Sequence, residues 1–470
     1  MLRGMQHDHT AGRRRRKRRL GHLIHASAGE ATHLREILDT GESAATPVIA
    51  AGVVLAVVGP LAAILDLARL RRRALLVTGT RAARGPRGIA MARTDAVARR
   101  RSKEELQAHT AREVAVSTSS PVRSFRRGFV PALLAPGAAV IVLDRLDAAG
   151  ALLLFVLAAA ALVPIAWLIG EATRQAAQHT GPGIGGFLNA SFGNAPEFVI
   201  AVVAVAHGLP EVVRASLAGS IVGNLLLVLG FVLVAAPPRK LDRTSAFASI
   251  AIVVVAALAM LPPAALAFGG EPDRHSLAVL SLPIAVALLI VRVLVNRRLL
   301  RRHRRLHAVS ESAPTGGWSL RSALGTLAVA TVITALVSQA LVASLEPFAR
   351  GAGLSELFVA AVIVAIAGNA TEHGSAVLLA ARGEVALATE IALASSAQVA
   401  GFLIPVVVLV SWAINPLALS FRPIEISSIA AAALAAGFVL AAGKSSRFAG
   451  VVLLAAYIGV AVSFFVAGAR

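Results

Sequence analysis

The sequence predicts an all-α polytopic membrane protein with about eleven transmembrane helices, and three observations lead to that prediction. Of its 470 residues, 57% are hydrophobic and only 15% are charged, and the mean hydropathy is +0.75. The apolar residues form runs of roughly 20, the length that a helix needs to cross the bilayer core. Two copies of one glutamate-containing pentapeptide divide the apolar region into halves. This composition excludes an ordinary soluble enzyme, and we assign no catalytic residues.

The absence of cysteine limits the chemistry further. Disulfide frameworks, thiolate metal sites and thiol catalysis are all excluded, because the chain has no cysteine. Any metal ion must therefore be held by oxygen or histidine ligands. No secretory signal with a cleavage site is evident, and we expect no cofactor.

Residues 1–128 are predicted to form a basic N-terminal extension. They hold 25 basic and 10 acidic side chains, a net +15, whereas residues 129–470 hold 21 and 15, a net +6. Arginine-rich runs occupy positions 13–19 and 71–73. We expect these runs to lie on the cytoplasmic side and to contact anionic lipid head groups. Nucleic-acid binding is the less favoured alternative.

One apolar stretch in the extension resists this scheme. Residues 47–68 are apolar enough to span a bilayer, but Asp66 interrupts them and arginines follow from Arg69 onward. If the stretch spanned, the basic run at 13–19 would lie outside, against the positive-inside rule. We interpret the stretch as an interfacial or hairpin segment. Residues 1–128 are then a tail that transport could dispense with, and Met91 is an alternative start.

The remainder of the chain divides into a first core helix at 129–148, a first repeat at 149–296, a basic cytoplasmic loop at 297–319 and a second repeat at 320–470. Each repeat has five spans. The eleven spans are centred near residues 137, 160, 195, 225, 257, 286, 332, 368, 397, 432 and 458. The first is short.

Charges in the loops predict the orientation of the core. With residues before 129 in the cytoplasm, every second loop is cytoplasmic, and these loops carry Arg239, Lys240, Arg243, Arg297, Arg298, Arg301, Arg302, Arg304, Arg305, Arg382, Lys444 and Arg447. The outer loops carry Asp144, Asp147, Glu271, Asp273 and Glu346, with Arg145, Arg214, Arg274 and Arg350 as exceptions. The positive-inside rule thus places the N-terminus of the core inside and its C-terminus outside.

The pentapeptides are the most informative feature of the sequence. Residues 193–197 read GNAPE and residues 368–372 read GNATE, each within an apolar span. The span after each copy contains small and amide residues: Gly219, Ser220 and Asn224 in the first half, and Ser395, Ser396 and Gln398 in the second. The copies lie in the third and eighth spans, five apart, so they cross the membrane in opposite directions. This is an inverted-topology repeat, which is common in secondary transporters.

The two glutamates predict a cation pathway. A charged side chain at the bilayer centre costs at least about 2.5 kcal/mol and usually marks an ion or proton route. Asn194 lies three residues before Glu197, and Asn369 three before Glu372, so each amide shares a helix face with its carboxylate. These oxygens suit Ca²⁺, Mn²⁺ or Na⁺, and carboxylates can exchange a metal ion for protons. Helix packing alone is the less favoured reading, because packing requires no buried acid.

Four stretches of this sequence resemble the calcium/proton antiporters of the cation/calcium exchanger superfamily: residues 186–197, residues 215–230, Gly368-Asn369-Ala370-Thr371-Glu372-His373, and Ser395-Ser396-Ala397-Gln398. The resemblance covers roughly residues 130–470. It implies that Glu197 and Glu372 are the paired cation ligands and that Asn194, Asn369, Ser220, Ser396 and Gln398 line the site. Asparagine in both pentapeptides favours the proton-coupled branch.

The resemblance also bears on proton transfer. The resemblance implies that Glu197 and Glu372 carry protons. His373 matches a family histidine, and it is either a further proton carrier or a residue that only hydrogen-bonds a neighbouring span. Glu390 stands where the family tends to have a small residue, and could be a third proton carrier or a partner for Arg214. Glu171 and Glu425, at span ends, are interpreted as interface residues. The sequence also departs from the family at two places. The loop at 297–307 is basic, whereas the corresponding loop of the family is often acidic. Pro196 stands where the family more usually has Thr or Val.

The function predicted from the sequence is Ca²⁺/H⁺ antiport by alternating access, exporting calcium with the proton gradient. The alternatives are sodium/calcium or broader divalent exchange including Mn²⁺, a passive cation channel, and a membrane-tethered nucleic-acid or lipid-binding protein. The Ala- and Arg-rich composition favours a bacterial inner membrane. The sequence fixes no oligomeric state.

Overall fold

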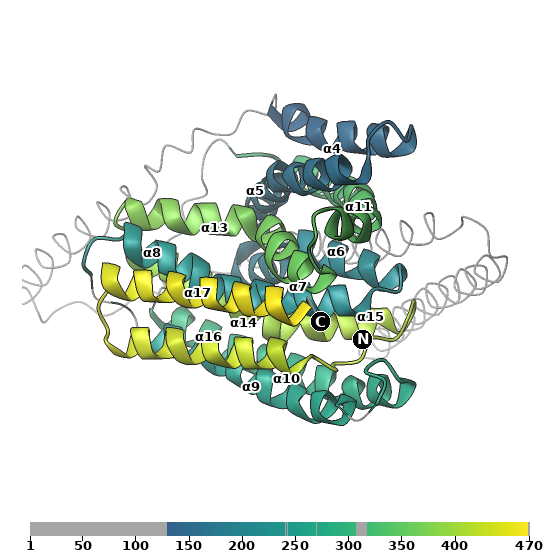
Figure 1. Cartoon of the computed structure of the whole chain (residues 1–470). Coiled ribbons are helices and arrows are strands. Elements are labelled where there is room, and N and C mark those ends of the chain that lie inside the picture. The colour runs from purple at the N-terminus through teal and green to yellow at the C-terminus, as the bar shows by residue number, and fades with distance from the viewer. Residues whose placement is uncertain (1–128, 240, 242, 269, 307–316, 469–470) are drawn as a thin grey trace, which may run out of the picture.

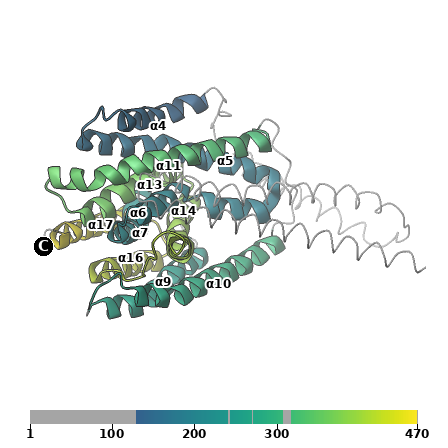
Figure 2. The same cartoon turned by 90° about the vertical axis from the view of Figure 1, so that its right-hand side faces the viewer.

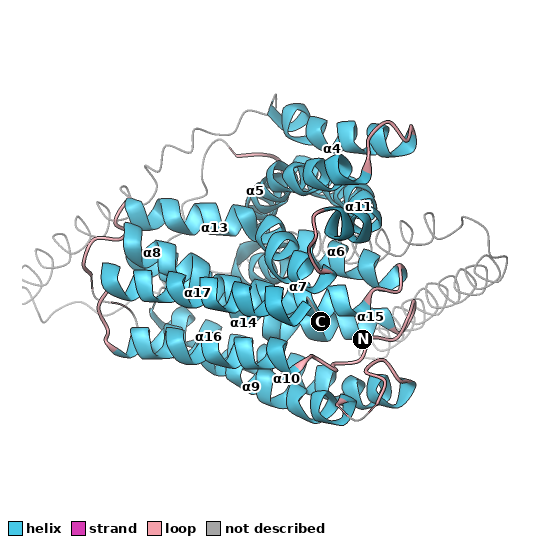
Figure 3. Ribbon diagram, in the orientation of Figure 1, coloured by secondary structure: helices cyan, strands magenta, loops and turns pink. Residues whose placement is uncertain are grey.

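The computed structural model describes residues 129–468, except for 240, 242, 269 and 307–316. The basic extension, including the stretch at 47–68, and the centre of the loop at 297–319 lie outside the described residues. Within the described part the chain folds into helices joined by short loops, and no strand occurs there (Figure 3). The all-α prediction is confirmed.

The helices follow one another in this order: α4 (Val130–Arg145), α5 (Ala151–Phe192), α6 (Ala195–Ala206), α7 (Pro210–Val222), the π-helix η2 (Gly223–Val228), α8 (Leu229–Ala235), α9 (Arg243–Ala267), α10 (His275–Leu306), α11 (Leu320–Gly351), α12 (Glu356–Phe358), η3 (Val359–Val364), α13 (Ala365–Ala381), α14 (Val385–Gln398), η4 (Val399–Leu403), α15 (Ile404–Ser411), α16 (Pro423–Ala441) and α17 (Arg447–Gly468). Several of these run on without a break, so that α7–η2–α8, α12–η3–α13 and α14–η4–α15 each form one membrane-length segment.

Nine helical segments in the described residues are long and apolar enough to cross a membrane. They match nine of the eleven expected spans, but the expected spans near residues 137 and 195 differ. The first is α4, with 16 residues, and the second is interrupted, because α5 continues to Phe192 and α6 begins at Ala195 with 12 residues. Pro196 lies in the first turn of α6, where its missing N–H costs no hydrogen bond. The count of eleven full spans is therefore not confirmed.

The helices form a layered bundle (Figures 1 and 2). In both views α4, α5 and α11 lie on one side and α9 and α10 on the other, with α6, α7, α13 and α14 between them. Phe155 of α5 stacks on Phe348 of α11 with ring centroids 4.1 Å apart. The pentapeptide segments thus lie in the middle of the bundle.

Burial separates central from peripheral spans. In the segment Pro210–Ala235, 83% of the most apolar 18-residue stretch is buried inside the protein. The corresponding share is only 22% in His275–Arg297 and in Arg447–Gly468. The exposed side chains of the peripheral helices are large and apolar, including Leu294 and Phe448. Apolar belts of this kind are stable against lipid chains and not against water. The chain is an integral multi-pass membrane protein.

The two halves of the bundle are related as the sequence predicts. Four candidate spans separate the segment that carries Glu197 from Glu356–Ala381, which carries Glu372. An even number of intervening crossings makes these two segments run in opposite directions. The following segment of each half, Pro210–Ala235 or Val385–Ser411, contains a π-helix at its centre. Such π segments occur frequently at functional sites.

Candidate cation-binding site

Glu197 and Glu372 line one cavity of about 270 Å³ near the middle of the bundle. Glu197 lies in the first turn of α6 and is buried, and Glu372 lies on α13 and is half-buried. The N-terminus of α6 is itself favourable for a carboxylate, because the positive end of the helix dipole stabilises a negative charge in the first turn. The inverted repeat therefore brings the two glutamates to a single site, as predicted.

Asn369 connects the two halves of the site. Its Nδ2 donates to Glu197 Oε1 and, over 3.0 Å, to Ser220 Oγ, while a third contact of 2.9 Å reaches the carbonyl of Ala365 one turn earlier on α13. The neighbouring Gly368 leaves room for Glu197, since a Cβ at Gly368 would lie 3.1 Å from Glu197 Cγ. The amide and the glycine of one pentapeptide thus accommodate the glutamate of the other.

A serine lies beside each glutamate, at the same spacing in both repeats. The Ser220 hydroxyl lies near Glu197, and the Ser395 hydroxyl lies near Glu372. Each serine is 23 residues after its glutamate. Asn224 Nδ2 donates to Ser395 Oγ over 3.0 Å, which links the first repeat to the second. The symmetry of the sequence is therefore reproduced in the contacts of the site.

Several buried oxygens of the two glutamates and of two asparagines in the first repeat have no hydrogen-bond partner. They are Oε2 of Glu197, Oε2 of Glu372, Oδ1 of Asn194 and Oδ1 of Asn224. Buried polar atoms are normally paired, because an unpaired one costs free energy. Carboxylate and amide oxygens are the ligands preferred by Ca²⁺ and other hard cations. In the part of the chain that is described, no group of three or more His, Asp or Glu side chains converges as a metal centre.

Four of the predicted site residues do not face the two glutamates. Ser396 is buried but directs its hydroxyl to the carbonyls of Ile221 and Ala392, so that its neighbour Ser395 is the one beside Glu372. Gln398 is the half-buried last residue of α14. Neither it nor His373 lines the cavity. Glu390 is exposed on α14.

Arg214 does not pair with Glu390. It is buried on α7, and its Nη1 lies 2.6 Å from Asp273 Oδ1 in the loop between α9 and α10. Glu171 and Glu425, which are expected at the membrane interface, are both buried among protein side chains. Glu425 caps α16 by accepting a hydrogen bond of 2.6 Å from the backbone N–H of Arg422.

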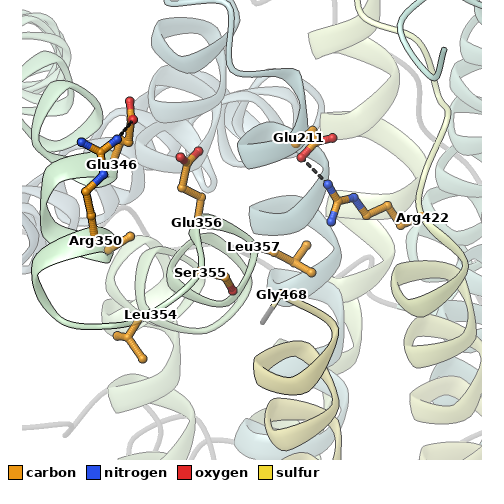
Figure 4. Close-up of a pocket in the computed structure, with 10 residues that line it drawn as sticks. Glu211, Glu346, Arg350, Leu354, Ser355, Glu356, Leu357, Arg422 and Gly468 are labelled. Atoms are coloured by element: carbon orange, nitrogen blue, oxygen red, sulfur yellow. Dashed lines mark hydrogen bonds and ion pairs between the residues drawn. The ribbon is translucent and has the colours of Figure 1, made fainter. Parts of the chain in front are cut away.

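A second cavity, of about 400 Å³, lies where α11 ends and α12 begins (Figure 4). Glu211 pairs there with Arg422, and Glu346 with Arg350, while Glu356 lies between these pairs. The hydrogen bond that Arg422 donates to Glu211 raises the pKa of the Arg422 guanidinium above its usual value. Glu356 is roughly 24 Å along its helix from Glu372. The cavity shares no lining residue with the one that holds the glutamates.

Two carboxylates from oppositely directed repeats, facing one cavity inside a helical membrane bundle, are typical of secondary transporters that carry cations. Comparison with known families agrees. The profile of the family described as sodium/calcium exchanger protein matches residues 150–298 and 322–466. The chain belongs to this family.

Individual relatives are similar over most of their length. The chain is 36% identical over 335 residues to the Ca(2+)/H(+) antiporter of Synechocystis, covering 66% of this chain and 90% of the relative. It is 33% identical over 348 residues to the Ca(2+)/H(+) antiporter ChaA of Bacillus subtilis, covering 71% and 97%. The solved structure of native YfkE superposes with a TM-score of 0.61 at 30% identity, covering 72% of this chain and 99% of YfkE.

Proposed function

We propose that this protein exchanges Ca²⁺ for H⁺ across a membrane by alternating access, and that Glu197 and Glu372 bind either the calcium ion or protons. The observation that carries the proposal is the pair of carboxylates in one cavity with an unpaired oxygen on each. Two carboxylates neutralise one Ca²⁺ or two protons, so the two cargoes compete for the same charge. The names of the relatives in Synechocystis and Bacillus subtilis support the same cargo.

The loop charges predict the orientation of the protein, and the proton gradient sets the direction of exchange. The arginine-rich loops favour a core with its N-terminus in the cytoplasm and its C-terminus outside. In that topology the cavity beside Glu197 and Glu372 opens toward the cytoplasm, and the cavity in Figure 4 faces outward. Calcium then leaves the cytoplasm as protons enter, which suits a bacterial inner membrane. The anionic lipids of that membrane are the expected contacts of residues 1–128.

Proton flux into liposomes tests the proposal. Purified protein is reconstituted with a pH-sensitive dye inside, and Ca²⁺, Mn²⁺, Na⁺ or K⁺ is added in turn. We expect Ca²⁺ to evoke proton movement, and Glu197→Gln or Glu372→Gln to abolish it. Glu384→Gln, an exposed acid at the start of α14, is the matched control and keeps the flux. Substantial exchange in Glu372→Gln would contradict the assignment.

Sodium/calcium exchange is the second candidate, because the family takes its description from that activity. Calcium uptake driven by internal sodium, without proton movement, would favour it. Broader divalent exchange would appear as proton movement evoked by Mn²⁺ as well as by Ca²⁺. A passive channel would dissipate a calcium gradient with no opposite proton flux.

A further inference from the structure

The cavity that holds Glu197 and Glu372 also contains an ion pair with no role in the proposed exchange. Glu171 and Arg174, both on α5, line this cavity. The Glu171 side chain is 7% exposed, whereas that of Arg174 is 53% exposed. The pair therefore extends from the buried interior of the cavity toward its open end.

Arg174 holds Glu171 by two charged hydrogen bonds. Its Nη2 donates to Glu171 Oε1 over 2.6 Å and its Nε donates to Oε2 over 2.9 Å, while Gln175 Nε2 donates to Oε1 over 2.7 Å. All three donors belong to α5 itself, within one turn of Glu171. The ion pair therefore does not connect α5 to another helix. A half-exposed guanidinium can leave a carboxylate without disturbing the packing of the bundle.

The formal charge of the cavity matches its proposed cargo. Three carboxylates and one guanidinium line it, which leaves a charge of −2 when no proton is bound. One divalent cation or two protons neutralise that charge. Without Arg174 the cavity would hold one negative charge more than Ca²⁺ can neutralise, and bound calcium would be released less readily.

We propose that Glu171 is a third cation ligand, at the entrance of the cavity, and that Arg174 is a tethered counter-ion which Ca²⁺ displaces on its way to Glu197 and Glu372. A divalent oxygen-seeking cation competes well with a guanidinium for a carboxylate. Arg174 returns to Glu171 once the ion has moved inward or left. This inference rests on the proposed exchange at Glu197 and Glu372, and adds an access step to it.

The two side chains should then affect calcium binding with opposite signs. Glu171→Gln removes an attractive charge, and we expect the Kd and the KM for Ca²⁺ to rise about fivefold. Arg174→Gln removes the competitor, and we expect both constants to fall about fivefold, with a lower kcat because release is slower. Since Arg174 acts through Glu171, the double variant should behave as Glu171→Gln alone.

The experiment measures calcium binding and transport separately. Calorimetry with the full purified chain in detergent gives the Kd for Ca²⁺, and liposome proton flux gives KM and kcat. Arg174→Lys, which keeps the charge, should lie within about twofold of the unaltered protein. Arg350→Gln removes the same charge from an ion pair in the other cavity and controls for a general electrostatic effect.

Two results would overturn the inference. The first is an unchanged Kd in both Glu171→Gln and Arg174→Gln. The second is an equal loss of thermal stability and kcat in both variants with no change in KM, which would give the pair a structural role. A failure of the exchange proposal looks different, because the unaltered protein would then bind Ca²⁺ without moving protons.

Discussion

At the residue scale, the site is asymmetric although the sequence is symmetric. The amide of Asn369 reaches across to Glu197 and Ser220, whereas both side-chain atoms of Asn194 lack a partner. Strict symmetry would have Asn194 reach Glu372 and Ser395 in the same way. The Asn369 amide is therefore held by hydrogen bonds, whereas the Asn194 amide bonds to nothing in this state.

This asymmetry predicts different effects of removing the two amides. Asn369→Ala removes the amide that donates to the Glu197 carboxylate, which costs about 1–3 kcal/mol and should lower the thermal stability of the ion-free protein. Asn194→Ala removes atoms that bond to nothing in this state and should leave that stability unchanged. Both variants should weaken calcium binding. Thermal unfolding and calcium titration of the two purified variants measure these effects, and equal destabilisation would contradict the asymmetry.

Competition at the carboxylates predicts a pH dependence. In the proposed exchange, protons and Ca²⁺ share the oxygens of Glu197 and Glu372, so the apparent Kd for Ca²⁺ should rise as the pH falls. Glu372→Gln leaves one titrating carboxylate in the pair and should make this rise less steep. Calcium titrations across a series of pH values, with the same ionic strength throughout, give the slope. A Kd independent of pH would contradict shared ligands.

The sequence predicted that both glutamates and both asparagines lie together, because a polar pentapeptide repeated in apolar spans is visible without a structure. The structure places Glu197, Glu372 and Asn369 at one cavity, which Asn194 does not line. The sequence could not decide between Ser395 and Ser396, since the choice depends on which face of α14 turns toward Glu372. A signal did exist, because Ser220 and Ser395 are each 23 residues after a glutamate. The sequence did not predict that Glu171 lines the cavity, because its partner is a half-exposed arginine and its position resembles a span end.

At the element scale, the interrupted third span shows the limit of counting apolar residues. Hydropathy predicts one continuous helix near residue 195, but the chain turns at Gly193 and Asn194 and restarts as α6. The break gives α6 a free N-terminus at Glu197, deep in the bundle. Helix termini inside a membrane bundle are tolerated where they line a cavity, as they do here.

The contact between α7 and η3 depends on Gly219. A Cβ at Gly219 would overlap the carbonyl of Ala361, so the two helices could not approach as closely with any other residue. Gly219→Ala should push η3 away from α7 and misplace Ser220. We expect a lower thermal stability and a transport rate reduced by at least about tenfold. Gly223→Ala on the same segment is the control, because no atom lies within 4 Å of the added carbon.

At the scale of the whole molecule, the absence of cysteine makes the orientation testable. A single cysteine can be introduced without a background of native thiols. Ala148→Cys lies in the loop after α4, and Arg382→Cys in the loop after α13; both positions are exposed. The positive-inside rule predicts that an impermeant thiol reagent labels Ala148→Cys on intact cells and Arg382→Cys only after permeabilisation. The reverse pattern would contradict the proposed orientation of the core and of its two cavities.

The basic extension provides the last prediction, because the family match begins at residue 150 and the described bundle at residue 129. Every residue assigned to the cation site lies after that point, so a chain that starts just before Phe129 should retain calcium-dependent proton flux. Its association with vesicles of anionic lipid should weaken, since residues 1–128 carry a net +15. Flux assays and membrane insertion of the shortened protein separate the two effects. Loss of flux in a shortened protein that inserts normally would make the extension part of the transport machinery.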